Sequence, residues 1–166
     1  MMNKIFFLIF FISIIANGQN SERLLKAEID SLVSLIPVNP KKPDEFSQIQ
    51  SSGLISKKCW IFINKTVGSF HEDVIYKNNS IYLIKKFTEN RNEIYDEYYY
   101  FENGNLIKYV KEIHKNQEVE NEFRSVYFQN DKVINGTKIK DLDINRILSY
   151  SDNKYSSWIE FINRNE

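Results

Sequence analysis

The chain has few of the residues that cross-link or interrupt a fold. Its 166 residues include one cysteine, three prolines and five glycines. With Cys59 alone no internal disulfide can form, so packing must hold the fold together. Cys59 lies in the apolar run Cys59–Ile63. We interpret it as a buried, inert side chain, with a reactive thiol as the alternative.

The sequence also lacks the motifs of the large enzyme and nucleotide-binding families. It has no G-x-S-x-G elbow, P-loop, G-x-G-x-x-G turn, zinc knuckle or EF-hand loop. Basic and acidic residues number 22 each, and 21 against 22 without Lys4. This balance does not favour nucleic acid as a partner. The sequence therefore predicts no cofactor and no metal, and it favours a protein without catalytic activity.

The first eighteen residues are typical of a secretory signal peptide. Lys4 precedes an apolar run over residues 5–15, and Ala16-Asn17-Gly18 forms a small-x-small cleavage site. The run is shorter than the roughly 20 apolar residues that span a bilayer, and no cysteine follows it for lipid attachment. We expect an exported chain from Gln19, periplasmic or extracellular, without a stable membrane anchor. Residues 19–166 are expected to form a single α+β domain.

The clearest structural signal is a β-hairpin within residues 93–113 that turns at Asn103-Gly104. Asn-Gly tolerates the positive φ angles of a type I′ turn, which joins two antiparallel strands. A two-residue loop with regular pairing places Tyr98 opposite Tyr109 and Asp96 opposite Lys111. Aromatic and opposite-charge pairs of this kind stabilise facing strands, so we predict this register.

Alternation along the hairpin divides its side chains between two faces. We expect Ile94, Tyr98 and Tyr100 to be buried. The opposite face then carries an aromatic stripe, which either lies beneath other parts of the chain or binds a partner. The predicted binding residues in this stripe are Tyr95, Tyr99, Phe101, Leu106 and Val110.

The pattern of this hairpin occurs three times. An aromatic residue, a polar residue, Asn, a residue that tolerates positive φ, a polar residue and an aliphatic residue follow one another at 76–81, 101–106 and 128–133. The leading asparagines lie 25 and 27 residues apart, a spacing of two strands and two turns. The sequence therefore predicts three successive hairpins in an antiparallel meander.

Helical periodicity occurs at both ends of the chain. Apolar residues at helical spacing predict a helix over 21–36, which Pro37 ends. The same spacing recurs over 142–148 and 155–162, with a break at Ser149–Asn153.

Between the first helix and the meander, residues 37–57 hold all three prolines and predict an extended connector. The first strand is expected at Cys59–Ile63 and a turn at Val67–Ser69. Together these signals predict an α+β fold. It has an N-terminal helix, an antiparallel meander of about seven strands, and C-terminal helices packed on one sheet face.

The two histidines, His71 and His114, are the candidate residues for an enzyme. In a strand, His71 and Asp73 point to one face and Glu72 to the other. A catalytic or metal site would need both histidines and a carboxylate brought together by the fold, and no H-x-x-x-H spacing supports this. We expect two solvated histidines near turns. The alternative is a small envelope hydrolase or metal-dependent enzyme that uses His71 and His114.

The leader ending at Gln19, the Lys/Asn/Ile-rich usage and the hairpin sequence YYYFENGNLI resemble small exported proteins of Bacteroidota. The aromatic-x-Asn-Gly-x-Leu hairpin is also similar to MORN-like hairpin repeats, over residues 74–135 at most. Asn78-Asn79 and Asn130-Asp131 depart from the Asn-Gly of those repeats. The resemblance implies no functional residue.

These observations favour an exported, non-catalytic binding protein that acts through one face of an antiparallel sheet. Its partner is expected to be a protein or a glycan. An immunity or inhibitor protein is a special case of this hypothesis.

Overall fold

The computed structural model describes residues 21–38, 40, 46–60, 63–115 and 120–165. The predicted signal peptide lies outside these residues. The chain divides into two units, residues 1–35 and 36–166. In the first unit residues 21–34 form an α-helix, as the apolar spacing predicts.

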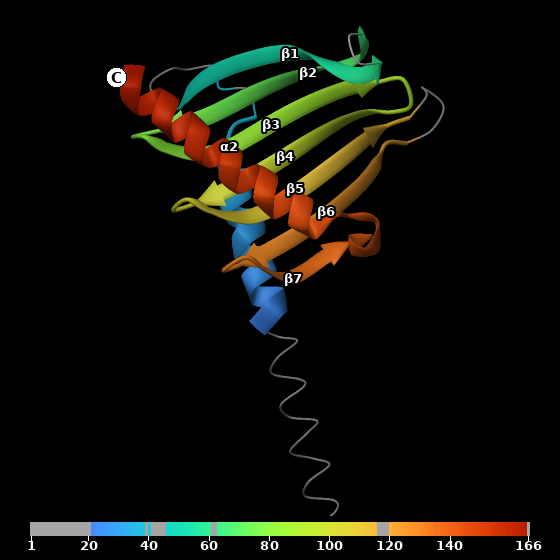
Figure 1. Cartoon of the computed structure of the whole chain (residues 1–166). Helices are drawn as coiled ribbons and strands as arrows, with labels where there is room; N and C mark the ends of the chain where they lie inside the picture. The colour runs from blue at the N-terminus through green and yellow to red at the C-terminus, as the bar shows by residue number, and fades with distance from the viewer. Residues whose placement is uncertain (1–20, 39, 41–45, 61–62, 116–119, 166) are drawn as a thin grey trace, which may run out of the picture. The chain divides into compact units, whose positions relative to one another are not determined.

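The second unit contains a seven-stranded antiparallel sheet whose strands follow one another in sequence order (Figure 1). The predicted α+β fold, with an N-terminal helix, a seven-stranded meander and a helix after the sheet, is therefore confirmed. The elements of this unit are β1 (Ser47–Trp60), β2 (Ile63–Lys77), β3 (Ser80–Asn90), β4 (Ile94–Glu102), β5 (Asn105–His114), β6 (Glu122–Gln129), β7 (Lys132–Thr137), a 3-10 helix η1 (Ile139–Asp141) and α2 (Ile144–Asn165).

The three predicted hairpins share one geometry. Both turn residues of each hairpin have positive φ, from 49° at Asn78 to 82° at Gly104, as a type I′ turn requires. Next to each turn the aromatic residue of the repeat pairs with its aliphatic residue. These pairs are Tyr76–Ile81, Phe101–Leu106 and Phe128–Val133.

A β-bulge follows each of these pairs and shifts the pairing of the two strands beyond it. In the central hairpin Ile107 is passed over, so Tyr100 pairs with Lys108. From there the predicted pairing is wrong by one residue: Tyr109 faces Tyr99, and Lys111 faces Glu97. A bulge opposes two residues to one, which moves the next part of one strand relative to its neighbour.

The first two strands are longer than predicted. The predicted connector is wrong from residue 47 onward, because residues 47–57 belong to β1. Of the predicted first strand, Cys59 and Trp60 end β1 and Ile63 begins β2. The turn expected at Val67–Ser69 is wrong, because β2 continues through it. A Cβ atom added to Gly68 would lie 2.2 Å from the carbonyl oxygen of Glu89. Gly68 therefore marks a close approach between strands.

A single helix, α2, crosses one face of the sheet (Figure 1). The break predicted at Ser149–Asn153 is wrong. Ser151 is buried, and its hydroxyl donates to the carbonyl oxygen of Leu148 at 2.8 Å, so this polar residue is accommodated inside the helix. Among the described residues no helix has the length and apolar character needed to cross a membrane.

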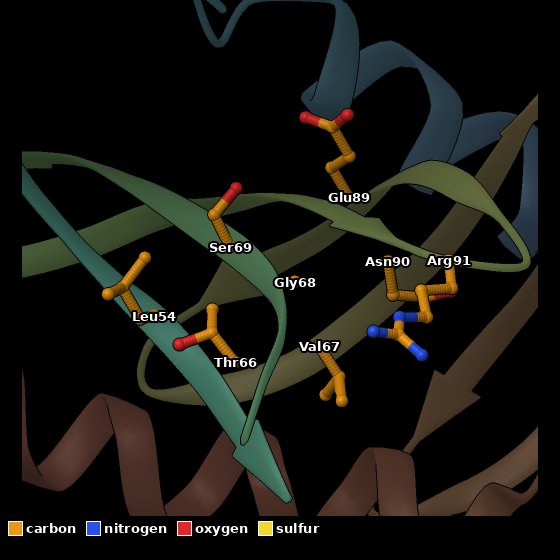
Figure 2. Close-up of a pocket in the computed structure, with 8 residues that line it drawn as sticks. All are labelled: Leu54, Thr66, Val67, Gly68, Ser69, Glu89, Asn90 and Arg91. Atoms are coloured by element: carbon orange, nitrogen blue, oxygen red, sulfur yellow. The ribbon is translucent and has the colours of Figure 1, made fainter. Parts of the chain in front are cut away.

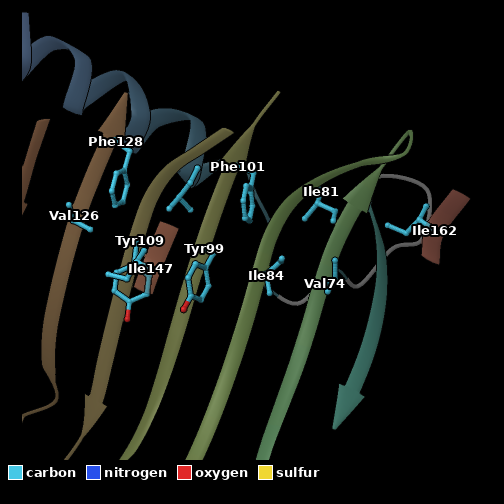
Figure 3. Packing of buried hydrophobic residues seen from close by; sticks show 11 residues of the cluster. Val74, Ile81, Ile84, Tyr99, Phe101, Tyr109, Val126, Phe128, Ile147 and Ile162 are labelled. Carbon is cyan, nitrogen blue, oxygen red and sulfur yellow. The ribbon is translucent and has the colours of Figure 1, made fainter. Parts of the chain in front are cut away.

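A cluster of buried apolar residues lies between α2 and the sheet. Tyr99 and Tyr109 pack edge to face with ring centroids 5.0 Å apart, and α2 contributes Ile147 and Ile162 at opposite ends of the cluster (Figure 3). The Tyr99 face of the hairpin is therefore the one that α2 covers. The buried cluster consists of Val74, Ile81, Ile84, Tyr99, Phe101, Leu106, Tyr109, Val126, Phe128, Ile147 and Ile162.

Candidate functional site

One flank of α2 forms a groove of about 380 Å³. Its lining residues recur every three or four positions, so they share one side of the helix. Three aromatic rings lie beside an amide, a hydroxyl and an ammonium group. We call this site the α2 groove, and its residues are Tyr150, Asn153, Lys154, Ser157, Trp158 and Phe161.

A buried carboxylate of β2 holds two of the lining side chains. Glu72 is 1% exposed and accepts a hydrogen bond from Lys154 Nζ at 2.9 Å. The Tyr150 hydroxyl donates to the other oxygen of Glu72. Burial, with the hydrogen bond and the charge of Glu72, raises the pKa of Tyr150. Like any phenol, Tyr150 is protonated at neutral pH and can donate to Glu72.

A second buried carboxylate, Glu97 of β4, holds the first turns of α2. Arg146 Nη2 and the Tyr109 hydroxyl each donate to Glu97 Oε1 at 2.8 Å. Burial lowers the pKa of Arg146, but the hydrogen bond with Glu97 and the charge of Glu97 together raise the pKa above its ordinary value. The helix is thus fixed to the sheet through both Glu72 and Glu97.

The strand register places these carboxylates in a row of alternating charge. Glu72, Lys86, Glu97 and Lys111 lie on neighbouring strands from β2 to β5, each paired with the next. Lys86 Nζ lies 4.5 Å from the centroid of the Tyr150 ring. Burial lowers the pKa of Lys86, and the charges of Glu97 and Glu72 oppose this change. The charged row therefore connects the sheet to the α2 groove through Tyr150.

Two aromatic side chains of the α2 groove contact each other. The Trp158 and Phe161 rings meet edge to face with centroids 5.7 Å apart, and Phe161 is 47% exposed. The Ser157 hydroxyl donates to the Asn153 carbonyl oxygen at 2.8 Å. Ligand pockets of about 300–1,000 Å³ commonly combine apolar and aromatic walls with a few polar groups, and the α2 groove has this composition.

The exposed aromatic stripe predicted from the sequence is wrong for three of its five residues. Tyr99, Phe101 and Leu106 are at most 2% exposed and belong to the core. Alternation gave two possible faces, and α2 covers the one that was expected to be free. Of the residues expected to be buried, Tyr100 is 8% exposed but Ile94 is 40% exposed.

The other two predicted binding residues lie on opposite faces of the sheet. Tyr95 shares the α2 side of β4 with Tyr99, is partly buried, and has Lys111 Nζ 3.9 Å from its ring centroid. Val110 pairs with Tyr98 on the other side because of the bulge. Since the five residues form no common surface, a binding role for Tyr95 or Val110 stays a separate prediction.

Each histidine contacts a carboxylate on the face opposite to Tyr99. His71 Nε2 lies 3.2 Å from Asp73 Oδ1, and His114 Nε2 lies 2.8 Å from Asp96 Oδ2. Glu72 points to the other face, as predicted. His71 is on β2 and His114 on β5, and three strand spacings of about 4.8 Å separate them by roughly 14 Å. The fold therefore does not bring the two histidines into one site.

The side chain of Cys59 lies outside the described residues, so its predicted burial is not tested. Among the side chains that are described, no three of histidine, cysteine, aspartate or glutamate are placed to hold a metal ion.

A second hollow, also of about 380 Å³, lies near one end of β1, β2 and β3 (Figure 2). It contains no aromatic ring and only two large apolar side chains. The α2 groove therefore has the stronger ligand-binding chemistry. The residues of the second hollow are Leu54, Thr66, Val67, Gly68, Ser69, Glu89, Asn90 and Arg91.

The helical spacing of the groove residues is visible in the sequence, but the break predicted at Ser149–Asn153 divided it. Tyr150, Lys154, Trp158 and Phe161 follow at intervals of four, four and three, which places them on one flank of a continuous helix. With the helix divided at Ser149–Asn153, Tyr150 and Lys154 fall outside the two predicted helical segments.

Comparison with protein families, curated proteins and solved structures gave no match for this chain. The resemblance to exported Bacteroidota proteins and to MORN-like repeats stays a prediction.

Proposed function

We propose that this protein is a non-catalytic binding protein, exported to the periplasm or outside the cell, that engages a protein or a glycan through the α2 groove. The groove itself is the observation that carries the proposal. The composition of the first eighteen residues supports export. The binding surface differs from the aromatic stripe expected from the sequence, because that stripe is largely core.

Aromatic groups in a groove favour binding because they provide large contact areas at little cost in side-chain entropy. Phe161 and Trp158 supply such an area, and Asn153 supplies an amide that can form directional hydrogen bonds. A glycan or an extended peptide presents both apolar and polar groups, which this lining matches.

The hydrogen bonds that hold α2 on the sheet also favour ligand binding. Glu72 and Glu97 hold the helix through Lys154, Tyr150 and Arg146. A groove whose walls are already fixed loses little conformational entropy when a ligand binds. The charged row thus preorganises the site.

The test is capture of partners from the native envelope fraction, together with a glycan-binding screen, using tagged protein purified from cells that express the full chain. The groove variant is Asn153→Ala/Phe161→Ala, which changes exposed positions. Phe123→Ala is the matched control, since Phe123 is 55% exposed on β6. A ligand retained by wild type and by the control, but lost from the groove variant, supports the proposal.

Direct titration of each candidate ligand, followed by tryptophan fluorescence, then measures the affinity at the site. Equal affinity for the groove variant and wild type would place binding elsewhere. The absence of any ligand from both screens, with folded protein, would count against a binding function.

A second candidate function is a small envelope hydrolase. The observation that favours it is the His114–Asp96 pair, since a histidine oriented by a carboxylate is the base of many hydrolytic sites. A substrate screen in which His114→Ala and Asp96→Asn abolish an activity of the wild type would support it. An activity unchanged in both variants would exclude this pair.

A further inference from the structure

The two edges of the sheet differ in their protection. The strand order leaves β1 and β7 as the outer strands. Within the part of the chain that the structure describes, β1 pairs with β2 alone and forms one border of the sheet (Figure 1). From Ser47 to Ile55 it pairs with β2 without interruption, and the register shifts only after Ile55. Nine residues therefore form a regular edge, about 30 Å long at 3.3 Å per residue.

The chemistry of this edge is unusual for a free strand. The run SQIQSSGLI has no charged residue and no proline, although 27% of the chain is charged. Lysine, proline and short length are the usual protections of exposed edges against pairing with another strand. Leu54 is 70% exposed, and Gln48, Gln50 and Ser52 are also exposed. The β1 edge has none of these protections over nine residues.

One charged residue of β2 next to the β1 edge is covered by side chains of that edge. Gln48 and Gln50 each donate a side-chain hydrogen bond to Asp73 Oδ1 at 2.8 Å. Asp73 is only 8% exposed. The amides thus satisfy the carboxylate, and the strand that approaches this edge meets neutral groups.

The β7 edge, in contrast, is short and bordered by charge. It has six residues, begins at Lys132, and is followed by Lys138 and η1. Lys138 Nζ contacts Glu122 at 2.9 Å, and Arg124 Nη1 donates to the Asp141 carbonyl oxygen at 3.3 Å. These features match the natural protections of an edge strand.

We propose that two copies of this protein pair antiparallel through β1 about a two-fold axis near Ser51. Ser51 is the middle of the regular run, so this axis lets all nine residues of one copy pair with the nine of the other. An isologous contact juxtaposes a strand with itself, which is unfavourable when the strand carries charge of one sign. The neutral run removes that penalty. The pairing also gives β1 a second neighbouring strand in both copies, where the described residues provide β2 alone, and it extends the seven-stranded sheet into the partner.

The test is sedimentation velocity over a range of concentrations, with protein purified from cells that express the full chain. Wild type is expected to form a dimer. With the axis at Ser51, residue 52 of one copy pairs with Gln50 of the other, so the two lysines of Ser52→Lys lie diagonally across the axis. Their repulsion is expected to weaken self-association by about fivefold. Val133→Lys puts the same charge on the β7 edge, at a residue 39% exposed, and should leave the dimer unchanged. Circular dichroism confirms that each variant is folded.

A charge exchange makes the test specific for a two-fold contact. Ser52→Glu alone should also weaken the dimer, and an equimolar mixture of Ser52→Lys and Ser52→Glu should restore it as a heterodimer. Three results would overturn the proposal. One is a wild type that remains monomeric at about 0.1 mM, another is a dimer that Ser52→Lys leaves intact, and the third is a dimer that Val133→Lys disrupts. An edge that captures other extended peptides while wild type stays monomeric would identify a heterologous partner instead.

Discussion

Arg146 Nη2 lies 2.8 Å from Glu97 Oε1 and joins α2 to a strand 49 residues earlier in the chain. The Glu97 side chain is fully buried, whereas that of Arg146 is 48% exposed. The arginine thus neutralises a carboxylate at the interface between helix and sheet while part of its guanidinium stays hydrated. This contact and the two hydrogen bonds to Glu72 fix the groove along α2.

Removal of Arg146 should destabilise the fold. Arg146→Ala removes the cation that is hydrogen-bonded to the buried Glu97, although Lys86 and Lys111 remain its neighbours on the adjacent strands. We expect a loss of about 2–3 kcal/mol. This is less than the ~3–5 kcal/mol seen where both partners are buried. Arg164→Ala is the control, since Arg164 pairs with Glu160 at an exposed site worth about 0–1 kcal/mol. Urea unfolding measures both. Equal losses for the two variants would contradict a special role for Glu97.

Two neighbouring tyrosines should respond differently to loss of the hydroxyl. Tyr109 donates to Glu97 at 2.8 Å, so Tyr109→Phe should cost about 1–3 kcal/mol. The Tyr99 hydroxyl is buried and has no hydrogen-bond partner among the described residues. Tyr99→Phe should therefore be neutral or stabilising. Thermal unfolding compares the variants. A loss at Tyr99 as large as that at Tyr109 would reveal a partner such as a buried water.

The turn residues should follow the conformational preferences of the type I′ turn. Gly104 has a φ of 82°, and Gly104→Ala should lower the free energy of unfolding by about 1 kcal/mol. Space is not the cause, since the nearest side-chain atom lies 3.6 Å from the added Cβ. Asp131 has a φ of 61°, and Asp131→Gly should stabilise the third hairpin by about 0.5 kcal/mol. In urea unfolding, a stabilising Gly104→Ala or a destabilising Asp131→Gly would contradict this prediction.

The free energy of unfolding should depend on pH through the ionisation of Glu122. Hydrogen bonds from Lys138, Lys115 and Arg124 lower the pKa of Glu122 from 4.5 to about 2. A carboxylate with a depressed folded-state pKa stabilises the fold above its unfolded pKa, and this contribution is lost as the pH falls towards the folded value. Glu122→Gln should therefore be less stable than wild type at pH 7, and the difference should shrink between pH 4.5 and pH 2. A constant difference across that range in urea unfolding would refute the assignment.

The hairpins were predictable because their signals are local. Each needs two residues that tolerate positive φ between strand-forming runs, and Asn78-Asn79, Asn103-Gly104 and Asn130-Asp131 provide them. The pairing of Phe101 with Leu106 follows directly from a two-residue loop. Turn position, strand order and fold class are thus readable from short windows of the sequence.

The register beyond the bulge was not predictable, because neighbouring residues have the same chemistry. Asp96 and Glu97 are both acidic, and Tyr98 and Tyr99 are identical, so a shift of one residue preserves an ion pair with Lys111 and an aromatic pair with Tyr109. Only the extra residue at the bulge distinguishes the two registers. That shift assigns Tyr109 rather than Val110 to the face of Tyr99.

The sequence by itself determined the meander of about seven strands, its three two-residue hairpin turns and the apolar stripe of the last helix, since these depend on backbone preference and periodicity. The tertiary structure decided which sheet face α2 covers, and with it the core position of Tyr99 and Phe101. It also decided the continuity of α2 through Ser151 and the burial of Glu72 and Glu97. Those outcomes depend on contacts between residues far apart in the chain, and no local pattern specifies them.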